Sequence, residues 1–456
     1  MRAKWGGYRT RWGCRPTGRL VPLWVTIEAP LIHRMTISKN DLPVTLSIGI
    51  MTWNEEASIG PMLESLFRQS IFGRLEARNE GYQIVCLANG CTDRTVEVAR
   101  ETMVQIDFDY LDRRGQSSWV AEIPEPGRNN AWNRFVHEIS APEARYLCLM
   151  DADIVFDQAN TLELVVGELE RNPHLGGASD CPRKNIAGKA RPSHRERLSL
   201  AASDMTETIE GRLNGMLYCM RAGIARNLYL PRDLIAIDDG FFKAAICTDF
   251  FSAPVDPSKV VSVRGATHLY EPYLSFRDVM NNQKRQMIGQ TTVYVVIEHV
   301  KTLPLCERAN LNATFRAKEA RDPDWLKKLI EAHIARPRPF WRLFPGILGF
   351  RWKRLAKMRG RRRLTHFPAA AAGFVITLLA CWQALRFLRR GVSTYWPKTV
   401  RQTIVPETPY AAKIRSKNPV NDRAFEPGED LGSREASRAP LGECEQGADQ
   451  TAAKLP

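Results

Sequence analysis

Acidic residues are missing from a long stretch in the C-terminal part of this chain. Between Ala332 and Pro406 there is no Asp or Glu, although the same stretch contains 16 Lys and Arg. The whole chain has a formal net charge of +15, whereas residues 45–331 sum to −5, so the basic excess lies in the flanks. A nucleic-acid reader needs a folded basic face. We therefore expect no nucleic-acid partner.

Closely spaced cysteine pairs are also missing. The ten cysteines are scattered over 456 residues, and no two of them form a Cys-x-x-Cys pair. This spacing argues against a zinc site or a disulfide framework. Several of the cysteines lie in apolar runs, where cysteine acts as a small hydrophobic residue. The pattern favours a reducing cytosolic environment.

Long uncharged apolar runs are scarce, and the candidate lies near the C-terminus. Residues 367–385 carry no charge, but this length is close to the lower limit for a spanning helix. Four consecutive alanines at 369–372 and Gln383 make the run only moderately apolar. We therefore expect residues 367–388 to form either a transmembrane or an interfacial helix. The region before it, 301–366, is expected to be helical, and it mixes cations with aromatic residues as membrane-surface segments do.

Strand and helix patterns alternate in the first half of the chain. Apolar runs that predict strands are each followed by a stretch with apolar residues at helical spacing. This alternation indicates βαβ units, and hence an α/β fold with a mostly parallel sheet covered by helices on both faces. The expected strands are 44–51, 83–88, 119–123 and 146–150, with further strands near 217–220 and 260–263, and the expected helices include 59–67, 127–140 and 161–171.

Two carboxylates follow the most apolar of these strands. Asp151 and Asp153 come directly after the uncharged run 146–150. Side chains alternate along a strand, so residues two apart leave its end on the same side. Open α/β sheets bind ligands at the carboxyl ends of their strands, and paired carboxylates suit a hard divalent cation that carries phosphates. Alone, the pattern is also common in turns and helix caps.

Further motifs lie before and after this pair. They are LSIGIMTWNEE at 46–56, NGCTDRT at 89–95, Gly127-Arg128 with Ala131 and Asn133, and Asn214-Gly215 to Arg221 with Asp238 and Asp239. Together with Asp151 and Asp153, these motifs resemble those of family 2 glycosyltransferases, which have the GT-A fold and usually invert the anomeric configuration. The resemblance covers about residues 45–290, with the motifs in the family's order. It implies a GT-A domain over 44–300, with a nucleotide-binding half at 44–155 and an acceptor half at 156–300.

This resemblance implies transfer of a sugar from a nucleoside-diphosphate donor, with Mg²⁺ or Mn²⁺ at the diphosphate. By the resemblance, Asp153 binds the metal, whereas Asp151 leans toward the ribose and lies near the metal. His268 is a further candidate for a metal ligand or a pocket residue. A single histidine is, however, more often structural.

The acceptor hydroxyl must lose a proton on the opposite face, which calls for a second carboxylate. Asp239 is the first choice for this base and Asp238 the second. The alternative is that both residues only cap a helix that begins near Gly240.

Five further side chains are expected to bind the donor. Thr52, Asn54 and Glu55 end the first strand and are placed to line the nucleotide pocket. Asn89 stands where the family usually has Asp; its amide can still meet a nucleobase edge because it both donates and accepts hydrogen bonds. Arg128 is expected to reach the donor phosphate.

The motif of processive, polymerising family members is incomplete in this chain. Residues 282–286 keep Arg285 but lack the first Gln and the Trp of Gln-x-x-Arg-Trp. Processive members also carry several spanning helices, and this chain has at most one. We therefore expect a single-addition enzyme, with Arg285 on the acceptor or diphosphate side.

The leading hypothesis is a glycosyltransferase on the cytoplasmic face of the inner membrane, either single-pass or peripheral. Its basic region would bind anionic lipid at about 1 kcal/mol per cation near the surface, and its acceptor would be a lipid-linked or other cell-envelope glycan. The alternative is a non-catalytic relative that acts as a membrane scaffold, which Asn89 and the incomplete Arg285 motif support. Residues 1–43 and 407–456 are expected to be a disordered basic extension and a disordered tail.

Overall fold

The computed structural model describes most of the chain between residues 37 and 390. The described ranges are 37–38, 42–109, 115–188, 213–234, 238–273, 275–337, 350–358 and 360–390, with isolated positions between 191 and 197 and between 343 and 347. The expected tail 407–456 and residues 1–36 of the expected extension lie outside the described residues.

Four parallel strands form one half of the main sheet. They lie side by side in the order β4-β3-β2-β5, so their carboxyl ends share one edge. Their apolar runs place every residue of β2 and β3 out of solvent, as expected for strands with helices on both faces. The four are β2 (Val44–Thr52), β3 (Gly81–Asn89), β4 (Gln116–Ile123) and β5 (Tyr146–Asp151).

The other half of the sheet is mixed. β8 (Leu217–Arg221) runs antiparallel to both β5 and β6 (Gly177–Ser179), and β9 (Val260–Ser262) is parallel to β6. At the opposite edge, β1 (Ile37–Ser38) pairs antiparallel with β4, so these two residues of the expected extension belong to the sheet. A second sheet pairs β7 (Arg183–Lys184) with β10 (Leu269–Tyr270).

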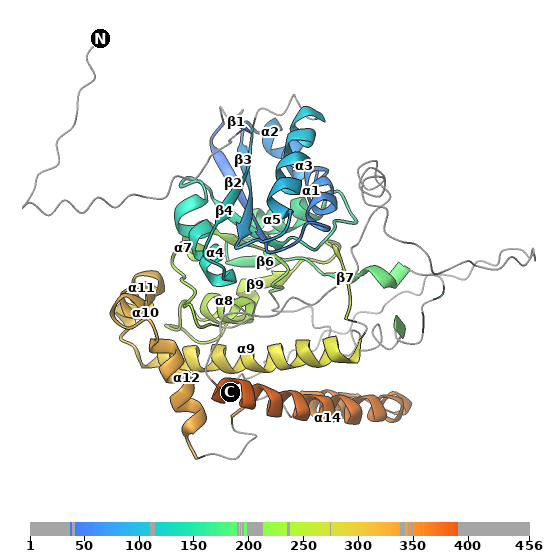
Figure 1. The fold of residues 1–456 in the computed structure, drawn as a ribbon, viewed down its shortest axis with the longest axis vertical. Helices are drawn as coiled ribbons and strands as arrows, with labels where there is room; N and C mark the ends of the chain where they lie inside the picture. The colour runs from blue at the N-terminus through green and yellow to red at the C-terminus, as the bar shows by residue number, and fades with distance from the viewer. Residues whose placement is uncertain are drawn as a thin grey trace, which may run out of the picture. The chain divides into compact units, whose positions relative to one another are not determined.

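Side-chain alternation on β3 explains the two hydrophobic cores. Tyr82, Ile84 and Cys86 face one core, whereas Val85 and Leu87 face the other. Each core is closed by a layer of helices (Figure 1). The first layer is α1 (Ile59–Phe67), α2 (Ile71–Ala77), α3 (Thr95–Asp109) and α5 (Thr161–Arg171), and the second includes α4 (Arg128–Arg134), α7 (Ala222–Arg226), α8 (Asp238–Cys247) and α9 (Phe276–Thr302). The predicted α/β class is confirmed.

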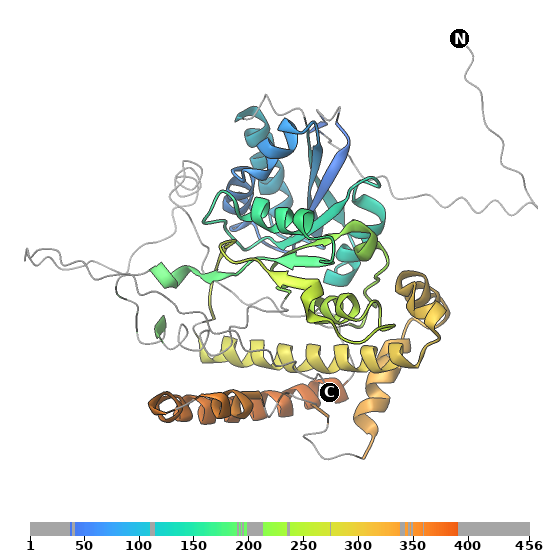
Figure 2. The same cartoon turned by 180° about the vertical axis from the view of Figure 1, so that it is seen from behind.

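The described part of the C-terminal region is helical. Its longest element, α14 (Arg361–Arg389), runs alongside α9 on the side away from the main sheet (Figures 1 and 2). Within the described residues, its segment Ala370–Arg389 is the one helix long and apolar enough to cross a membrane. The remaining helices here are α10 (Leu305–Arg308), α11 (Leu311–Arg321), α12 (Trp325–Ala335) and α13 (Phe350–Lys357).

Candidate active site

An ion pair stands at the carboxyl end of β5. Nη1 of Arg128, in the first turn of α4, donates to Oδ1 of Asp151 at 2.6 Å. The second guanidinium nitrogen donates to the carbonyl of Gly215 at 3.1 Å. The two side chains remain 31% and 25% exposed, so a ligand can still reach them. Arg128, expected at the donor phosphate, therefore also positions the Asp151 carboxylate.

Asp239 lies close to this ion pair. A Cβ atom on Gly215 would be 3.4 Å from Cγ of Asp239, so the carboxyl group lies against the backbone whose carbonyl Arg128 binds. Oδ1 of Asp239 also accepts the backbone N–H of Gly240 at 2.9 Å. Asp239 therefore contributes to the start of α8 and faces the site as well. The side chain of Asp238 lies outside the described residues.

Asp153 is half-buried, two residues beyond Asp151. Within the part of the chain that the structure describes, no three His, Cys, Asp or Glu side chains gather into a group that could hold a metal ion. Magnesium sites commonly use only one or two protein carboxylates, with the substrate phosphates and water as the other ligands. A donor set centred on Asp153 fits that pattern.

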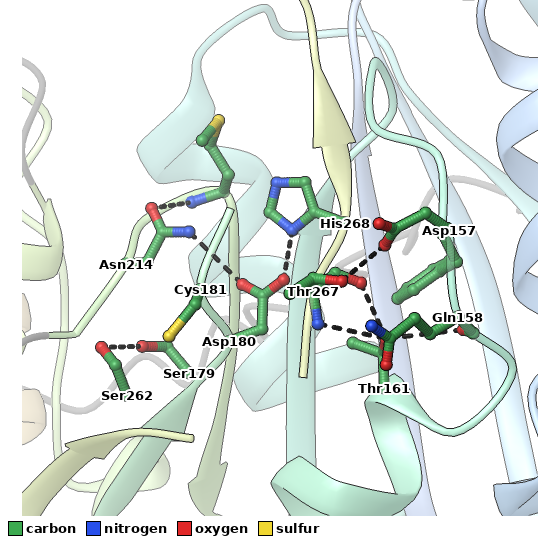
Figure 3. Close-up of polar contacts among 12 residues, drawn as sticks. Asp157, Gln158, Thr161, Ser179, Asp180, Cys181, Asn214, Ser262, Thr267 and His268 are labelled. Carbon is green, nitrogen blue, oxygen red and sulfur yellow. Dashed lines mark hydrogen bonds and ion pairs between the residues drawn. The ribbon is translucent and has the colours of Figure 1, made fainter. Parts of the chain in front are cut away.

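His268 is fixed by a buried carboxylate that we did not single out from the sequence. Its Nδ1 donates to Oδ2 of Asp180 at 2.5 Å, and both side chains are fully buried. Asn214 donates to the other oxygen of Asp180 at 3.4 Å, so Asp180 lies between the two (Figure 3). A neutral imidazole that donates from Nδ1 has its lone pair on Nε2. That Nε2 is buried and has no hydrogen-bond partner.

Metal-binding histidines usually donate their other ring nitrogen to a carboxylate. The Asp180–His268 pair has this arrangement, and the unpaired Nε2 is the atom that would bind. His268 therefore fits a metal better than its isolated position in the sequence indicated. Asp180 carried no sequence signal, because it follows Gly177–Ser179, a strand of three small residues.

The two turns that resemble nucleotide-binding motifs are tied together. Oδ1 of Asn54 accepts the backbone N–H of Thr92 at 2.7 Å, and the backbone N–H of Glu55 donates to the hydroxyl of Thr95 at 2.7 Å. The Glu55 carboxylate accepts a hydrogen bond from Ser58 at 2.7 Å. Asn54 and Glu55 thus position these turns, whatever contacts they make with a donor.

Thr52 and Asn89 end neighbouring strands but differ in whether the side chain has an atom left to bind a ligand. The Thr52 hydroxyl lies within the fold, 3.3 Å from Sγ of Cys86, whose thiol pKa burial raises to about 12. Oδ1 of Asn89 is buried and has no hydrogen-bond partner. Gly90 follows with a φ of +62°, and a Cβ there would come within 2.8 Å of Pro126. Asn89 is therefore the better candidate for a nucleobase contact.

Arg285 lies on α9 and is half-buried. No contact between described residues joins it to the Arg128–Asp151 pair. Its expected place on the acceptor or diphosphate side stays a prediction.

The fold and the acidic strand end together define an α/β domain of the GT-A type. The family described as Glycosyl transferase family 2 matches residues 47–229. This range contains most of β2 and all of β3 to β8, together with the Arg128–Asp151 pair, Asp153 and Asp180. Over this range the chain is similar to family 2 glycosyltransferases, and the predicted enzyme class, a glycosyltransferase, is confirmed.

Two solved structures are similar at low identity. One is the mannosyltransferase PcManGT from Pyrobaculum calidifontis in complex with GDP-Man and Mn²⁺, with 15% identity, a TM-score of 0.45, and coverage of 76% of this chain and 88% of that one. The other is glucosyl-3-phosphoglycerate synthase from Mycobacterium tuberculosis in complex with Mn²⁺, UDP-glucose and phosphoglyceric acid. It has 14% identity and a TM-score of 0.36, and the match covers 57% of this chain and 81% of that one. No curated protein matches significantly. Likenesses this distant carry no argument about substrates.

Proposed function

We propose that this enzyme transfers one sugar at a time from a nucleoside-diphosphate donor to a hydroxyl acceptor, with inversion. The observation that carries the proposal is the position of Gly215. Its carbonyl accepts a hydrogen bond from the Arg128 guanidinium that binds Asp151, and a Cβ added to it would lie 3.4 Å from Cγ of Asp239. Gly215 thus lies between the Arg128–Asp151 pair, which we place on the donor side, and the Asp239 carboxylate, which is suited to act as the base.

The side chains divide the reaction between them. Arg128 holds the Asp151 carboxylate at the strand end, and its positive charge favours a departing diphosphate. Asp239 receives the proton of the acceptor hydroxyl as that oxygen attacks the anomeric carbon. The new bond forms on the face opposite the leaving nucleoside diphosphate, which is why the product is inverted.

A divalent cation belongs in the same site. Asp153 would hold Mg²⁺ or Mn²⁺, with Asp151 nearby. His268 is a further candidate ligand through Nε2, although among the described residues it does not gather with the two carboxylates into one group of three. When bound, the ion supplies Lewis-acid stabilisation of the charge that develops on the diphosphate. Asp180 and Asn214 keep the imidazole in its orientation and tautomer.

Asp180→Asn is expected to weaken Mn²⁺ binding by about 10- to 100-fold, because an amide no longer fixes the His268 tautomer. Binding of Mn²⁺ to the purified protein, measured by calorimetry with a nucleoside diphosphate present, tests this. Asp157→Asn is the matched control, since Asp157 binds Thr267, the neighbour of His268, at 2.7 Å (Figure 3). Equal affinity in both variants would remove His268 from the metal site.

The proposed activity is tested with purified protein and a panel of nucleotide sugars. We expect release of one nucleoside diphosphate, loss of that release in EDTA, and recovery on addition of Mn²⁺ or Mg²⁺. Turnover that is unchanged in EDTA would contradict the metal assignment. Metal-independent binding of donor without transfer or hydrolysis would favour the alternative of a non-catalytic scaffold.

We also propose that the enzyme acts at the cytoplasmic face of the inner membrane on a lipid-linked or other envelope-glycan acceptor. Two features support membrane association: the absence of acidic residues from 332–406 and the apolar segment Ala370–Arg389. The incomplete motif at Arg285 supports single addition.

A further inference from the structure

The outer face of α14 is an apolar stripe. Val375, Leu378, Leu379 and Trp382 are 54%, 39%, 46% and 50% exposed. They are spaced three and four residues apart, so they lie on one side of the helix. Phe367, 52% exposed, extends this outer stripe by two turns toward the start of α14. Such a row of large exposed apolar side chains marks a surface that binds something.

The opposite face of α14 is already occupied. Ala380, Cys381 and Ala384 are completely buried, and the helix packs along α9 (Figures 1 and 2). Small side chains on this face let the two helices approach closely. Because half of its circumference is committed to the protein, α14 has only the outer stripe to offer to a lipid phase.

The helix that α14 packs on is too polar to follow it through a bilayer. On α9, Glu298 and Lys301 form an ion pair at 2.9 Å and are about half exposed, and Lys284 and Arg285 are also part of this helix. Charged side chains in the hydrocarbon centre cost several kcal/mol each. A spanning α14 would have to separate from α9 or draw these charges into the membrane.

The charges around the stripe show which surface it fits. Exposed cations lie near both of its ends, and no acidic residue occurs between 332 and 406. The Arg386 guanidinium lies 4.7 Å from the centre of the Trp382 ring, so a cation and an interfacial aromatic share one end. The exposed cations are Lys353 and Arg363 near the N-terminal end and Arg386, Arg389 and Arg390 at the C-terminal end.

We infer that α14 lies in the plane of an anionic lipid surface. Its outer stripe is inserted into the lipid, and α9 lies on the side of α14 that faces away from the membrane. This inference rests on the membrane association proposed above and excludes the spanning alternative. The enzyme is then monotopic: the stripe enters the acyl boundary, while the flanking cations bind the lipid headgroups.

Vesicle binding of the full-length protein tests the stripe. The double variant Val375→Glu/Leu379→Glu is expected to bind vesicles of equal parts phosphatidylglycerol and phosphatidylcholine roughly tenfold or more weakly than wild type. Val104→Glu is the matched control, since Val104 is 57% exposed on α3 and should leave binding unchanged. Melting temperature and donor turnover in detergent show whether each variant is folded, independently of lipid.

Depth of insertion separates lying in the plane from spanning. Leu379 is near the middle of the candidate span Ala370–Arg389, so the extra fluorescence of Leu379→Trp reports its depth. We expect stronger quenching by lipids brominated close to the headgroup than by lipids brominated near the chain ends. The reverse order would establish a span and overturn the inference.

Two other results would also overturn it. Wild-type protein that turns over donor but ignores vesicles would exclude a lipid surface while leaving the catalytic proposal intact. A double variant that changes from dimer to monomer without lipid, and still binds vesicles, would make the outer stripe a surface for self-association.

Discussion

Asp153→Asn is expected to lower sugar transfer by roughly 10³-fold. The amide has the shape of the carboxylate but not its charge, so a divalent cation at this site would lose its main anionic protein ligand and would bind the donor diphosphate less well. Initial rates at saturating donor, measured over a range of Mn²⁺ concentrations, should show a loss in kcat that added metal restores only in part.

The control for this variant is Asp157→Asn, which removes a charge four residues away. Asp157 is engaged by Arg183 at 3.3 Å and by Thr267, so it should change activity little. An Asp153→Asn enzyme with wild-type turnover would refute the assignment of the metal to this carboxylate.

Asp239→Asn is expected to reduce transfer by about 10²- to 10⁴-fold, the usual contribution of a general base. An amide cannot take the acceptor proton, yet its oxygen can still accept the N–H of Gly240, so the start of α8 is retained. Binding of donor, measured by calorimetry without acceptor, should be unchanged. This separation of binding from turnover distinguishes a base from a structural residue.

Asp249→Asn provides the comparison just beyond the other end of α8, where Asp249 pairs with Lys259 at 2.5 Å. It should behave as wild type. If Asp239→Asn is active and Asp238→Asn is not, then the second candidate is the base.

The parallel half of the fold could be predicted because its strands are buried on both faces. A continuous apolar run is a strong local signal, and the predicted strand 44–51 and helix 161–171 agree with β2 and α5 within one residue. The mixed half could not be predicted in this way. β6 has only Gly, Ala and Ser, and its strand structure depends on pairing with β8 and β9 from distant parts of the chain.

One long helix was missed although the sequence contains its start signal. Residues 276–302 have a polar run that hides the apolar periodicity, so we expected only mixed structure there. Ser275 nevertheless caps α9, since its hydroxyl accepts the N–H of Asp278 at 3.1 Å. A Ser three residues before an acidic residue is a known sign of a helix start.

The site was predicted as a set of residues, not as a set of contacts. Asp151, Arg128 and Asp239 were named, yet their meeting at Gly215 depends on β8 lying beside β5, which no local pattern shows. His268 and Asp180 are 88 residues apart, so their pairing was equally invisible. The spacing of residues in the sequence identifies the members of a motif. Contacts between residues far apart in the sequence can be identified only from the three-dimensional structure.

Helix α4 has a consequence for recombining this enzyme with its relatives. Besides Arg128, it carries Asn129, whose amide donates to the carbonyls of Pro231 and Leu234, and Asn133, which exchanges two hydrogen bonds with Leu230. This helix, from the half that we expect to bind the nucleotide, thus holds the segment 230–234 of the half that we expect to bind the acceptor. In a chimera joined near residue 155, the hydrogen bonds of Asn129 and Asn133 would meet a segment from another protein. These bonds are kept only if α4 and residues 213–234 come from the same parent.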